Sequence, residues 1–198
     1  MVPAIALSIG GSDSGGGAGI QADLKTFLAL QVHGCTAISC ITAQNTCGVS
    51  RVDGLVPEAL TAQIEAVCSD LPVAALKTGM LLNSALISAT AAALKGLSIP
   101  KLIDPVMVSR AGAVLLESEA IEAYRRLLLP QAELLTPNIH EAQLLSGCSI
   151  ATAADVEQAA GLLLEQGPAA VLIKGGGLAD LRGSDYLLQA DGQGCWLR

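Results

Sequence analysis

Aromatic residues are almost absent from this sequence: Phe, Tyr and Trp together make up 2% of its 198 residues. Ala, Val, Leu and Ile therefore supply most of the 52% of residues that are apolar. A core of such aliphatic side chains has to interdigitate closely, which suits helices layered on a sheet. A chain of this length buries about 70% of the surface that its unfolded form exposes, which is enough for one domain with a sizeable core.

Basic residues are also scarce. Lys and Arg number 11 against 18 Asp and Glu, and the formal net charge is -7. Because no run of basic residues offers a stripe to a nucleic-acid backbone, we expect no DNA or RNA partner. No apolar stretch reaches the roughly 18 to 20 residues of a membrane span, and no basic segment precedes the first apolar run. We therefore expect a cytoplasmic protein that does not contact membranes.

Cysteine pairs with metal-site spacing are missing as well. The six cysteines include no C-x-x-C pair, and the two histidines, His33 and His140, are far in sequence from any group of potential ligands. Neither a disulfide framework nor a zinc site is indicated. We interpret the cysteines as free thiols in a reducing compartment.

Strand-like and helix-like segments alternate along the chain, which predicts an α/β fold with a parallel sheet covered by helices on both sides. Pro57 opens one helix, and Thr152 with Asp155 resembles a capping box at the start of another. The last segment, 184–198, is expected to form a hairpin. The expected strands are 4–9, 35–45, 73–80, 101–108, 132–138 and 169–177, and the expected helices are 19–30, 57–71, 83–95, 118–128 and 152–166.

Polar side chains follow the ends of the expected strands. In open parallel sheets, ligands bind outside the carboxyl ends of the strands, so we expect these side chains to converge on one rim. They are Gln44, Asn45, Lys77, Met80, Asp104, Asn138, Glu141 and Lys174.

A glycine-rich segment joins the first expected strand to the first helix: six of the ten residues from Gly10 to Gly19 are glycine. It is not a Walker A loop, because no Lys and no hydroxyl follow where they would serve phosphate and Mg²⁺. Residues 17–22 match a loose G-x-G-x-x-A dinucleotide-binding motif, but the motif starts too far after the first strand. No acidic residue stands at the end of the second strand, where it would bind a ribose. The segment can be a plain surface turn, or it lets main chain approach a ligand closely; we favour the second interpretation.

The ordered motifs GGSDSGGGAGIQADLKTF, ITAQNTCGV, KTGML, DPVMVSRAG, LLTPNIHEAQLL and LIKGGG resemble those of the hydroxymethylpyrimidine/phosphomethylpyrimidine kinases of thiamine biosynthesis, in the ribokinase-like superfamily. The resemblance implies a single three-layer α/β/α kinase domain over residues 1–198 with a central, mostly parallel sheet. It implies phosphorylation of 4-amino-5-hydroxymethyl-2-methylpyrimidine and then of its monophosphate, with ATP and Mg²⁺, by a homodimer.

The resemblance also assigns roles to individual residues. The pyrimidine ring would be bound by Gly11, Ala18, Asp23, Gln44, Met80 and Val106. Asn138 and Lys174 would contact the ATP phosphates, and Asp104 and Glu141 would hold the metal ion, directly or through water. Carboxylate oxygens are the ligands that Mg²⁺ prefers. The loop would thus serve the phosphoryl acceptor rather than the adenosine.

Several of these residues also have plain structural interpretations. Asp104 before Pro105 can be a turn residue, Met80 can be core, and Lys174 can be a strand-end lysine that reaches water. Glu141 can lie in a solvated first helical turn. We interpret His140 as an exposed residue at a helix start and Cys40, in a buried strand, as packing.

The family's glycine-rich GTGC-type segment, whose backbone amides form the anion hole, has no match here. The residues Gly192–Cys195 have a similar sequence, but they fall in the expected hairpin and no helix follows them. Cys195 is therefore not assigned as catalytic. The resemblance places the anion-hole Cys or Asp beyond Arg198, so no catalytic residue is assigned within the sequence. It therefore implies a domain truncated before this segment and a chain that is poorly active alone. A pyridoxal-type kinase and a noncatalytic pyrimidine-binding protein remain as alternatives.

Overall fold

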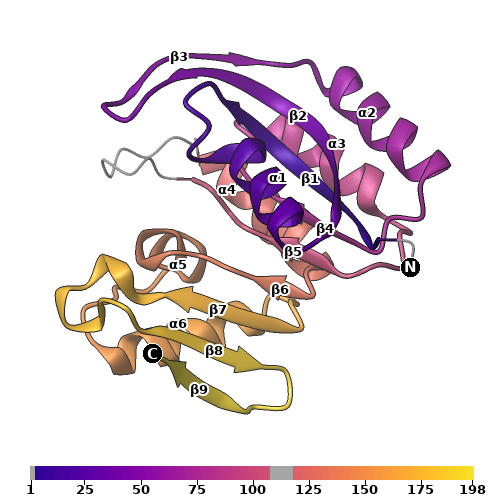
Figure 1. The fold of residues 1–198 in the computed structure, drawn as a ribbon. Coiled ribbons are helices and arrows are strands. Elements are labelled where there is room, and N and C mark those ends of the chain that lie inside the picture. The colour runs from indigo at the N-terminus through magenta and orange to yellow at the C-terminus, as the bar shows by residue number, and fades with distance from the viewer. Residues whose placement is uncertain (1–2, 108–117) are drawn as a thin grey trace. The chain divides into compact units, whose positions relative to one another are not determined.

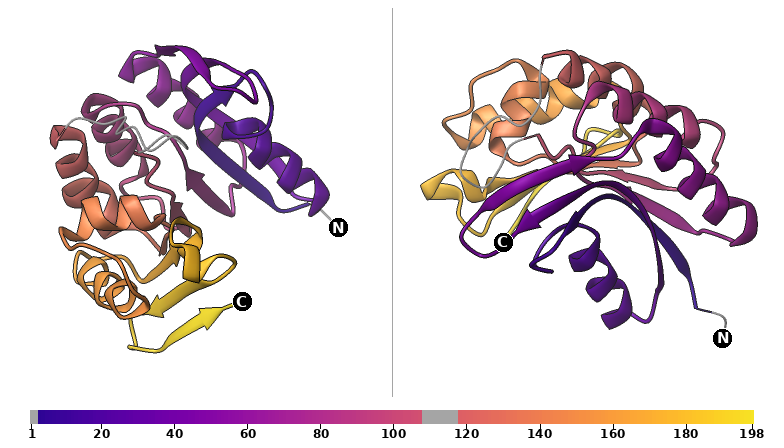
Figure 2. Two further views of the ribbon diagram at one scale, coloured as in Figure 1. Left: turned by 90° about the vertical axis from the view of Figure 1, so that its left-hand side faces the viewer. Right: turned by 90° about the horizontal axis from the view of Figure 1, so that it is seen from above.

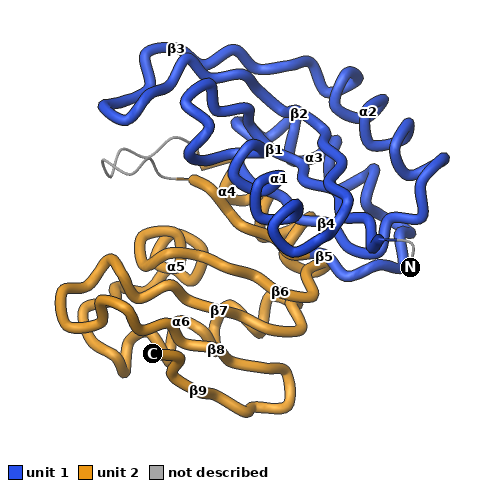
Figure 3. Tube along the Cα trace, in the orientation of Figure 1, with its two compact units in different colours: residues 1–101 blue, residues 102–198 orange. Residues whose placement is uncertain are grey.

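The computed structural model describes residues 3–107 and 118–198, and the chain divides into two compact units, residues 1–101 and 102–198 (Figure 3). Unit 1 begins with a strand–helix–strand segment. Its elements are β1 (Ile5–Asp13), α1 (Gly19–Ala29), β2 (His33–Gln44), β3 (Val49–Gly54), α2 (Pro57–Asp70), β4 (Ala75–Thr78) and α3 (Ser84–Leu94) (Figure 1).

The strands of unit 1 lie in the order β3-β2-β1-β4. β1 is parallel to both β2 and β4, and β3 is antiparallel to β2. Helix α1 packs on one face of these strands, and α2 and α3 lie on the other, which gives three layers (Figure 2). The core of the unit is aliphatic and almost fully buried; it includes Leu7, Ile9, Leu60, Ile64 and Leu86.

Unit 2 starts within β5 (Lys101–Ile103). It continues with α4 (Ser118–Ala123), a π-helical turn (Tyr124–Leu128), β6 (Leu134–Leu135), α5 (Ile139–Ser146), α6 (Ala153–Leu164), β7 (Ala170–Lys174), β8 (Asp185–Gln189) and β9 (Gly194–Leu197). β5, β6 and β7 are parallel, and β8 and β9 follow as antiparallel strands. α5 and α6 pack on each other and on β7, and α6 also packs on β8 (Figure 1).

Most helix starts are where the sequence predicts them. Pro57 is the first residue of α2, the Asn83 side chain caps α3, and Thr152 and Asp155 form the expected capping box of α6. The terminal hairpin is also confirmed, with Cys195 exposed in β9. Of the helices in the described part of the chain, none is both long and apolar enough to cross a membrane.

The expected strand bounds need correction. The strands expected over 73–80, 132–138 and 169–177 are shorter and span Ala75–Thr78, Leu134–Leu135 and Ala170–Lys174. β1 runs on through the glycines to Asp13 instead of ending at Ile9. β3 was not expected at all. The strand expected over 101–108 ends at Ile103, and Val108 lies outside the described residues.

Candidate active site

The amides of the glycine loop are held by a carboxylate of the chain itself. Asp13, 5% exposed at the end of β1, accepts hydrogen bonds from Gly15 N at 2.8 Å, Gly17 N at 2.9 Å and Ala18 N at 2.8 Å. Burial alone would raise the pKa of Asp13, but the hydrogen bonds from the loop amides outweigh it and hold that pKa below its usual value. These three amides are therefore already paired with an anion.

Side chains at the loop also fix the end of β2. Ser14 Oγ donates to Gln44 O at 2.7 Å and accepts from Gln44 N at 2.8 Å. Thr42 Oγ1 lies 3.0 Å from Ser12 O and 3.3 Å from Gln44 Oε1. The Gln44 main chain is thus tied to the loop by Ser14, and its side-chain oxygen lies beside Thr42 of the same strand.

Gly11 occupies an irregular position of β1, where the pairing with β2 shifts between Gly10 and Ser12. A Cβ at Gly11 would lie 3.0 Å from both Cys40 Sγ and Met80 Cε. The absence of a side chain at Gly11 therefore lets the Met80 thioether lie directly against the main chain. Cys40 is fully buried, as expected of a packing residue.

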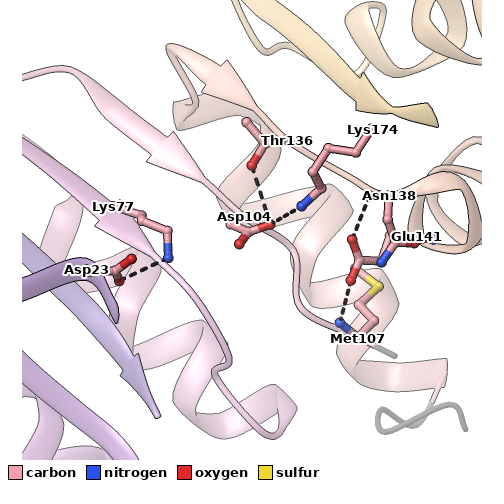
Figure 4. Close-up of polar contacts among 8 residues, drawn as sticks. All are labelled: Asp23, Lys77, Asp104, Met107, Thr136, Asn138, Glu141 and Lys174. Carbon is pink, nitrogen blue, oxygen red and sulfur yellow. Dashed lines mark hydrogen bonds and ion pairs between the residues drawn. The ribbon is translucent and has the colours of Figure 1, made fainter. Parts of the chain in front are cut away.

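Asp23 on α1 lies over two strand residues that are direct neighbours in the β1–β4 pairing, Ser8 and Lys77. Its Oδ2 accepts from Ser8 Oγ at 2.6 Å and from Lys77 Nζ at 3.0 Å (Figure 4). Gly11, Ala18, Asp23, Gln44 and Met80 thus gather around the carboxyl ends of the parallel strands β1, β2 and β4. We call these five residues the unit 1 cluster.

A second group surrounds the carboxyl ends of β5, β6 and β7 in unit 2. Lys174 Nζ lies 3.0 Å from Asp104 Oδ1, and Thr136 Oγ1 donates to the same oxygen at 3.4 Å (Figure 4). The Lys174 side chain is 40% exposed and that of Asp104 is 19% exposed. We call Asp104, Asn138, Glu141 and Lys174 the unit 2 cluster.

Asn138 and Glu141 form the capping box of α5. Asn138 Oδ1 accepts from Glu141 N at 3.0 Å, and Glu141 Oε2 accepts from Asn138 N at 2.8 Å. Glu141 Oε1 also accepts from Met107 N at 3.3 Å. Glu141 is 2% exposed, so the alternative of a solvated helical turn is wrong, whereas His140 is exposed as expected.

Burial is the main reason why the pKa of Glu141 is raised, and the nearby Asp104 carboxylate raises it further. Lys174 and the amides of Asn138 and Met107 act in the opposite direction. Burial also raises the pKa of Tyr124, which is fully buried, and the negative charges of Asp104 and Glu141 raise it further. The Asp104 and Glu141 carboxyl groups thus lie close enough to affect each other, and Lys174 offsets part of their charge.

Two carboxylates fit the way in which Mg²⁺ accompanies a nucleotide, because the ion then takes one or two carboxylates together with phosphates and waters. Among residues 3–107 and 118–198, no three His, Cys, Asp or Glu side chains are grouped as in an all-protein metal site. Asp104 and Glu141 offer such oxygens, although both Glu141 oxygens also accept from main-chain N–H groups, and their binding of a metal ion stays a prediction.

Val106 is the one predicted pyrimidine contact that belongs to unit 2. It is half-buried, and its N–H donates to Asp104 O at 2.9 Å. Its contact with a ring stays a prediction.

The anion-hole residue expected beyond Arg198 also stays a prediction. Cys195 pairs with Leu187 in the β8–β9 hairpin, and its side chain is exposed there. Arg198 directly follows Leu197, the last residue of β9. The GQGC sequence around Cys195 thus belongs to a turn and an edge strand, which agrees with leaving Cys195 without a catalytic role.

Ser8, Asp13 and Lys77 have no individual role in the sequence-based prediction. The sequence does mark Lys77 as a candidate site residue, because only five lysines occur in the chain and this one lies at the end of an expected strand. The capping box of Asn138 and Glu141 also has a recognisable N-x-x-E pattern. Nothing in the sequence indicates that Asp13 turns back onto the loop amides.

Comparison with known sequences gives consistent results. A family model described as "Phosphomethylpyrimidine kinase" matches residues 13–197. The hydroxymethylpyrimidine/phosphomethylpyrimidine kinase of Synechococcus elongatus is 57% identical over 94% of this chain and 71% of its own length. The protein of the same name from Streptomyces coelicolor is 45% identical over 100% of this chain and 73% of its own length.

Solved structures are similar along nearly the whole chain. The phosphomethylpyrimidine kinase of Clostridium difficile is 41% identical, with a TM-score of 0.90 over 98% of this chain and 83% of that structure. An ADP complex of Bacillus subtilis pyridoxal kinase is 36% identical, with a TM-score of 0.89 over 98% of this chain and 74% of that structure. The predicted ribokinase-like α/β fold is thereby confirmed.

Proposed function

Since this chain belongs to the phosphomethylpyrimidine kinase family, we propose that it transfers the γ-phosphoryl group of ATP to the hydroxymethyl group of 4-amino-5-hydroxymethyl-2-methylpyrimidine. The monophosphate of this aminopyrimidine is the second acceptor, and the diphosphate serves thiamine biosynthesis. The observation that supports phosphoryl transfer best is the unit 2 cluster, in which an ammonium and two carboxylates meet at the ends of parallel strands.

The unit 1 cluster binds the aminopyrimidine. Asp23 and Gln44 carry the acceptor and donor groups that the ring's amino group and nitrogens need. The polarizable thioether of Met80 covers a ring face, and Val106, which belongs to unit 2, stays a predicted ring contact. Because Gly11 has no side chain and the Ala18 side chain is small, the main chain of the loop approaches the ring closely.

The unit 2 cluster binds the phosphates. The Lys174 ammonium moves from Asp104 to a phosphate oxygen as negative charge redistributes during transfer. Asn138 contacts the ATP phosphates and helps to orient them. Asp104 and Glu141 would hold Mg²⁺, directly or through water, and the bound ion would neutralise charge on the phosphates. Positioning and electrostatic stabilisation account for the rate in this scheme, because phosphoryl transfer needs little covalent chemistry from the protein.

The single truncated domain, the homodimer, the cytoplasmic location and the poor activity of the chain alone stay predictions. A pyridoxal-type kinase is the second candidate function, because a pyridoxal kinase is 36% identical with a TM-score of 0.89.

Product analysis by mass spectrometry separates the two candidates. The chain is incubated with Mg²⁺, ATP and equal concentrations of the aminopyrimidine and pyridoxal, for times long enough to detect slow turnover. We expect aminopyrimidine phosphate to exceed pyridoxal phosphate at least tenfold. Pyridoxal phosphate as the main product would overturn the proposed acceptor, and the absence of both products together with the absence of aminopyrimidine binding would overturn the function.

A variant pair connects the activity to the unit 1 cluster. Asp23→Asn should reduce aminopyrimidine phosphorylation at least tenfold, since a charged acceptor is lost from the ring. Asp70→Asn is the matched control: Asp70 is exposed at the end of α2, and activity should not change. Equal rates for the two variants would contradict the role of Asp23.

A further inference from the structure

The ion pair between Lys77 and Asp23 lies between α1 and the sheet of unit 1. The Lys77 side chain is 26% exposed and that of Asp23 is 18% exposed. A partly buried ion pair is weak support for stability, because desolvation offsets much of the attraction. α1 is already held on the strands by apolar packing, since Ile20 is 5% exposed and a Cβ at Gly34 would collide with Leu24 and Phe27. The pair therefore points to a role beyond anchoring the helix.

The two oxygens of Asp23 are not equivalent. Oδ2 accepts both from Ser8 Oγ at 2.6 Å and from Lys77 Nζ at 3.0 Å. Within the residues that the structure describes, Oδ1 accepts no hydrogen bond. One oxygen thus fixes the carboxylate and the other is available to a ligand.

The fixing groups stand on rigid elements. Ser8 and Lys77 are register partners in the parallel pairing of β1 with β4, so the spacing of their side chains is set by the sheet and not by a loop. Groups built on strands and helices hold a binding geometry more tightly than groups on loops. The direction of Asp23 Oδ1 is therefore determined by two strands and one helix.

Charge leads to the same conclusion. The Lys77 ammonium offsets the Asp23 carboxylate, so the pair carries no net charge. A balanced pair with one open acceptor suits an uncharged ring that carries an N–H donor.

We propose that Lys77 is a positioning residue: with Ser8, it orients Asp23 so that Oδ1 accepts a hydrogen bond from an exocyclic amino group on a neutral heterocycle. Lys77 itself does not touch the ligand. The proposal rests on the proposed function, which places the aminopyrimidine at Asp23, and it adds the residues that select for the amino group.

Isothermal titration with two rings tests this proposal on the full chain. The ligands are 4-amino-5-hydroxymethyl-2-methylpyrimidine and its analogue without the 4-amino group. Lys77→Met should weaken binding of the aminopyrimidine about tenfold and change binding of the analogue less than about twofold, because the analogue makes no hydrogen bond to Oδ1. Lys95→Met is the matched control; Lys95 is exposed after α3, and neither affinity should change.

The outcomes are distinguishable. Equal weakening of both rings by Lys77→Met would show a purely structural role and overturn the proposal, as would unchanged binding of both rings. Binding of neither ring by the unsubstituted chain would overturn the proposed function itself, and the inference with it.

Ser8→Ala provides a second variant if Lys77→Met does not fold, as judged by circular dichroism. It removes one donor to Oδ2 and leaves the ion pair in place. We expect aminopyrimidine binding to weaken about threefold, again with no effect on the analogue. Loss of affinity for both rings to the same extent, or for neither, would contradict the proposal.

Discussion

Gly19 shows how much of the site depends on one missing side chain. Its φ is +56°, and a Cβ there would collide with the carbonyl oxygen of Gly11. Gly19→Ala should therefore lower the free energy of unfolding by about 2 to 4 kcal/mol, measured by urea denaturation. Gly17→Ala is the control, because a Cβ at Gly17 meets only Asp13 Oδ2 at 4.0 Å. Similar losses in both variants would contradict this explanation.

Lys174 is the residue on which nucleotide binding should depend most. Its ammonium is 3.0 Å from Asp104 and its side chain is 40% exposed, so it can reach a phosphate oxygen. Lys174→Met should weaken binding of a nonhydrolysable ATP analogue about 10- to 100-fold, because a charge-assisted hydrogen bond is lost. The affinity for the aminopyrimidine should change less than about twofold in the same titration. Unchanged affinity for the ATP analogue would contradict the assignment.

The grouping of the candidate site residues could be predicted from the sequence better than their hydrogen bonds. Asp104, Asn138 and Lys174 follow strands, and parallel strands bring such positions to one edge. The structure groups them in unit 2 as that rule requires. The bonds of Asp13 and Asp23 could not be predicted, because they depend on the conformation of the loop and on the register of β1 with β4.

At the scale of elements, the glycine loop should depend on pH through Asp13. The folded pKa of Asp13 is lowered, so its contribution to stability is fully present above the unfolded value of about 3.9 and is lost as the pH falls through the folded pKa. Asp13→Asn should lower the free energy of unfolding by about 2 kcal/mol at pH 7, since hydrogen bonds to a charged acceptor are lost.

Urea denaturation at several pH values checks this prediction. The difference in stability between the unsubstituted chain and Asp13→Asn should be constant from pH 7 to about pH 5 and should shrink below about pH 4. A difference that stays constant down to pH 3 would show that the ionised carboxylate is not what holds the loop.

The sequence predicts elements with a buried face better than exposed ones. The helices after Pro57 and Asn83 and the capping box at Thr152 have local signals that the structure confirms. β3 was missed because all six of its residues are exposed, and an exposed strand has no apolar pattern to recognise. The sequence does not predict the extension of β1, because glycines are depleted in strands and favour a loop.

For the whole molecule, nucleotide binding should raise the melting temperature in a way that depends on the metal. A ligand at about 100 times its Kd stabilises a protein by about 2.7 kcal/mol. For a chain of this size, this corresponds to a shift of roughly 5 to 10 °C. We expect this shift with Mg²⁺ and the ATP analogue, measured by calorimetry.

Chelation of the metal provides the control. EDTA should remove most of the shift caused by the ATP analogue and leave the shift caused by the aminopyrimidine unchanged, because the two carboxylates that would hold the ion belong to the unit 2 cluster. An equal effect of EDTA on both shifts would contradict the division of roles between the clusters.

A crystal structure of the chain with the aminopyrimidine, Mg²⁺ and the ATP analogue would show which ligand lies at which cluster. We expect the ring against Asp23, Gln44 and Met80, with its amino group on Asp23 Oδ1. We expect the phosphates at Lys174 and the metal ion at Asp104 and Glu141. Phosphates bound to the amides of the glycine loop, or a ring away from Asp23, would contradict this expectation.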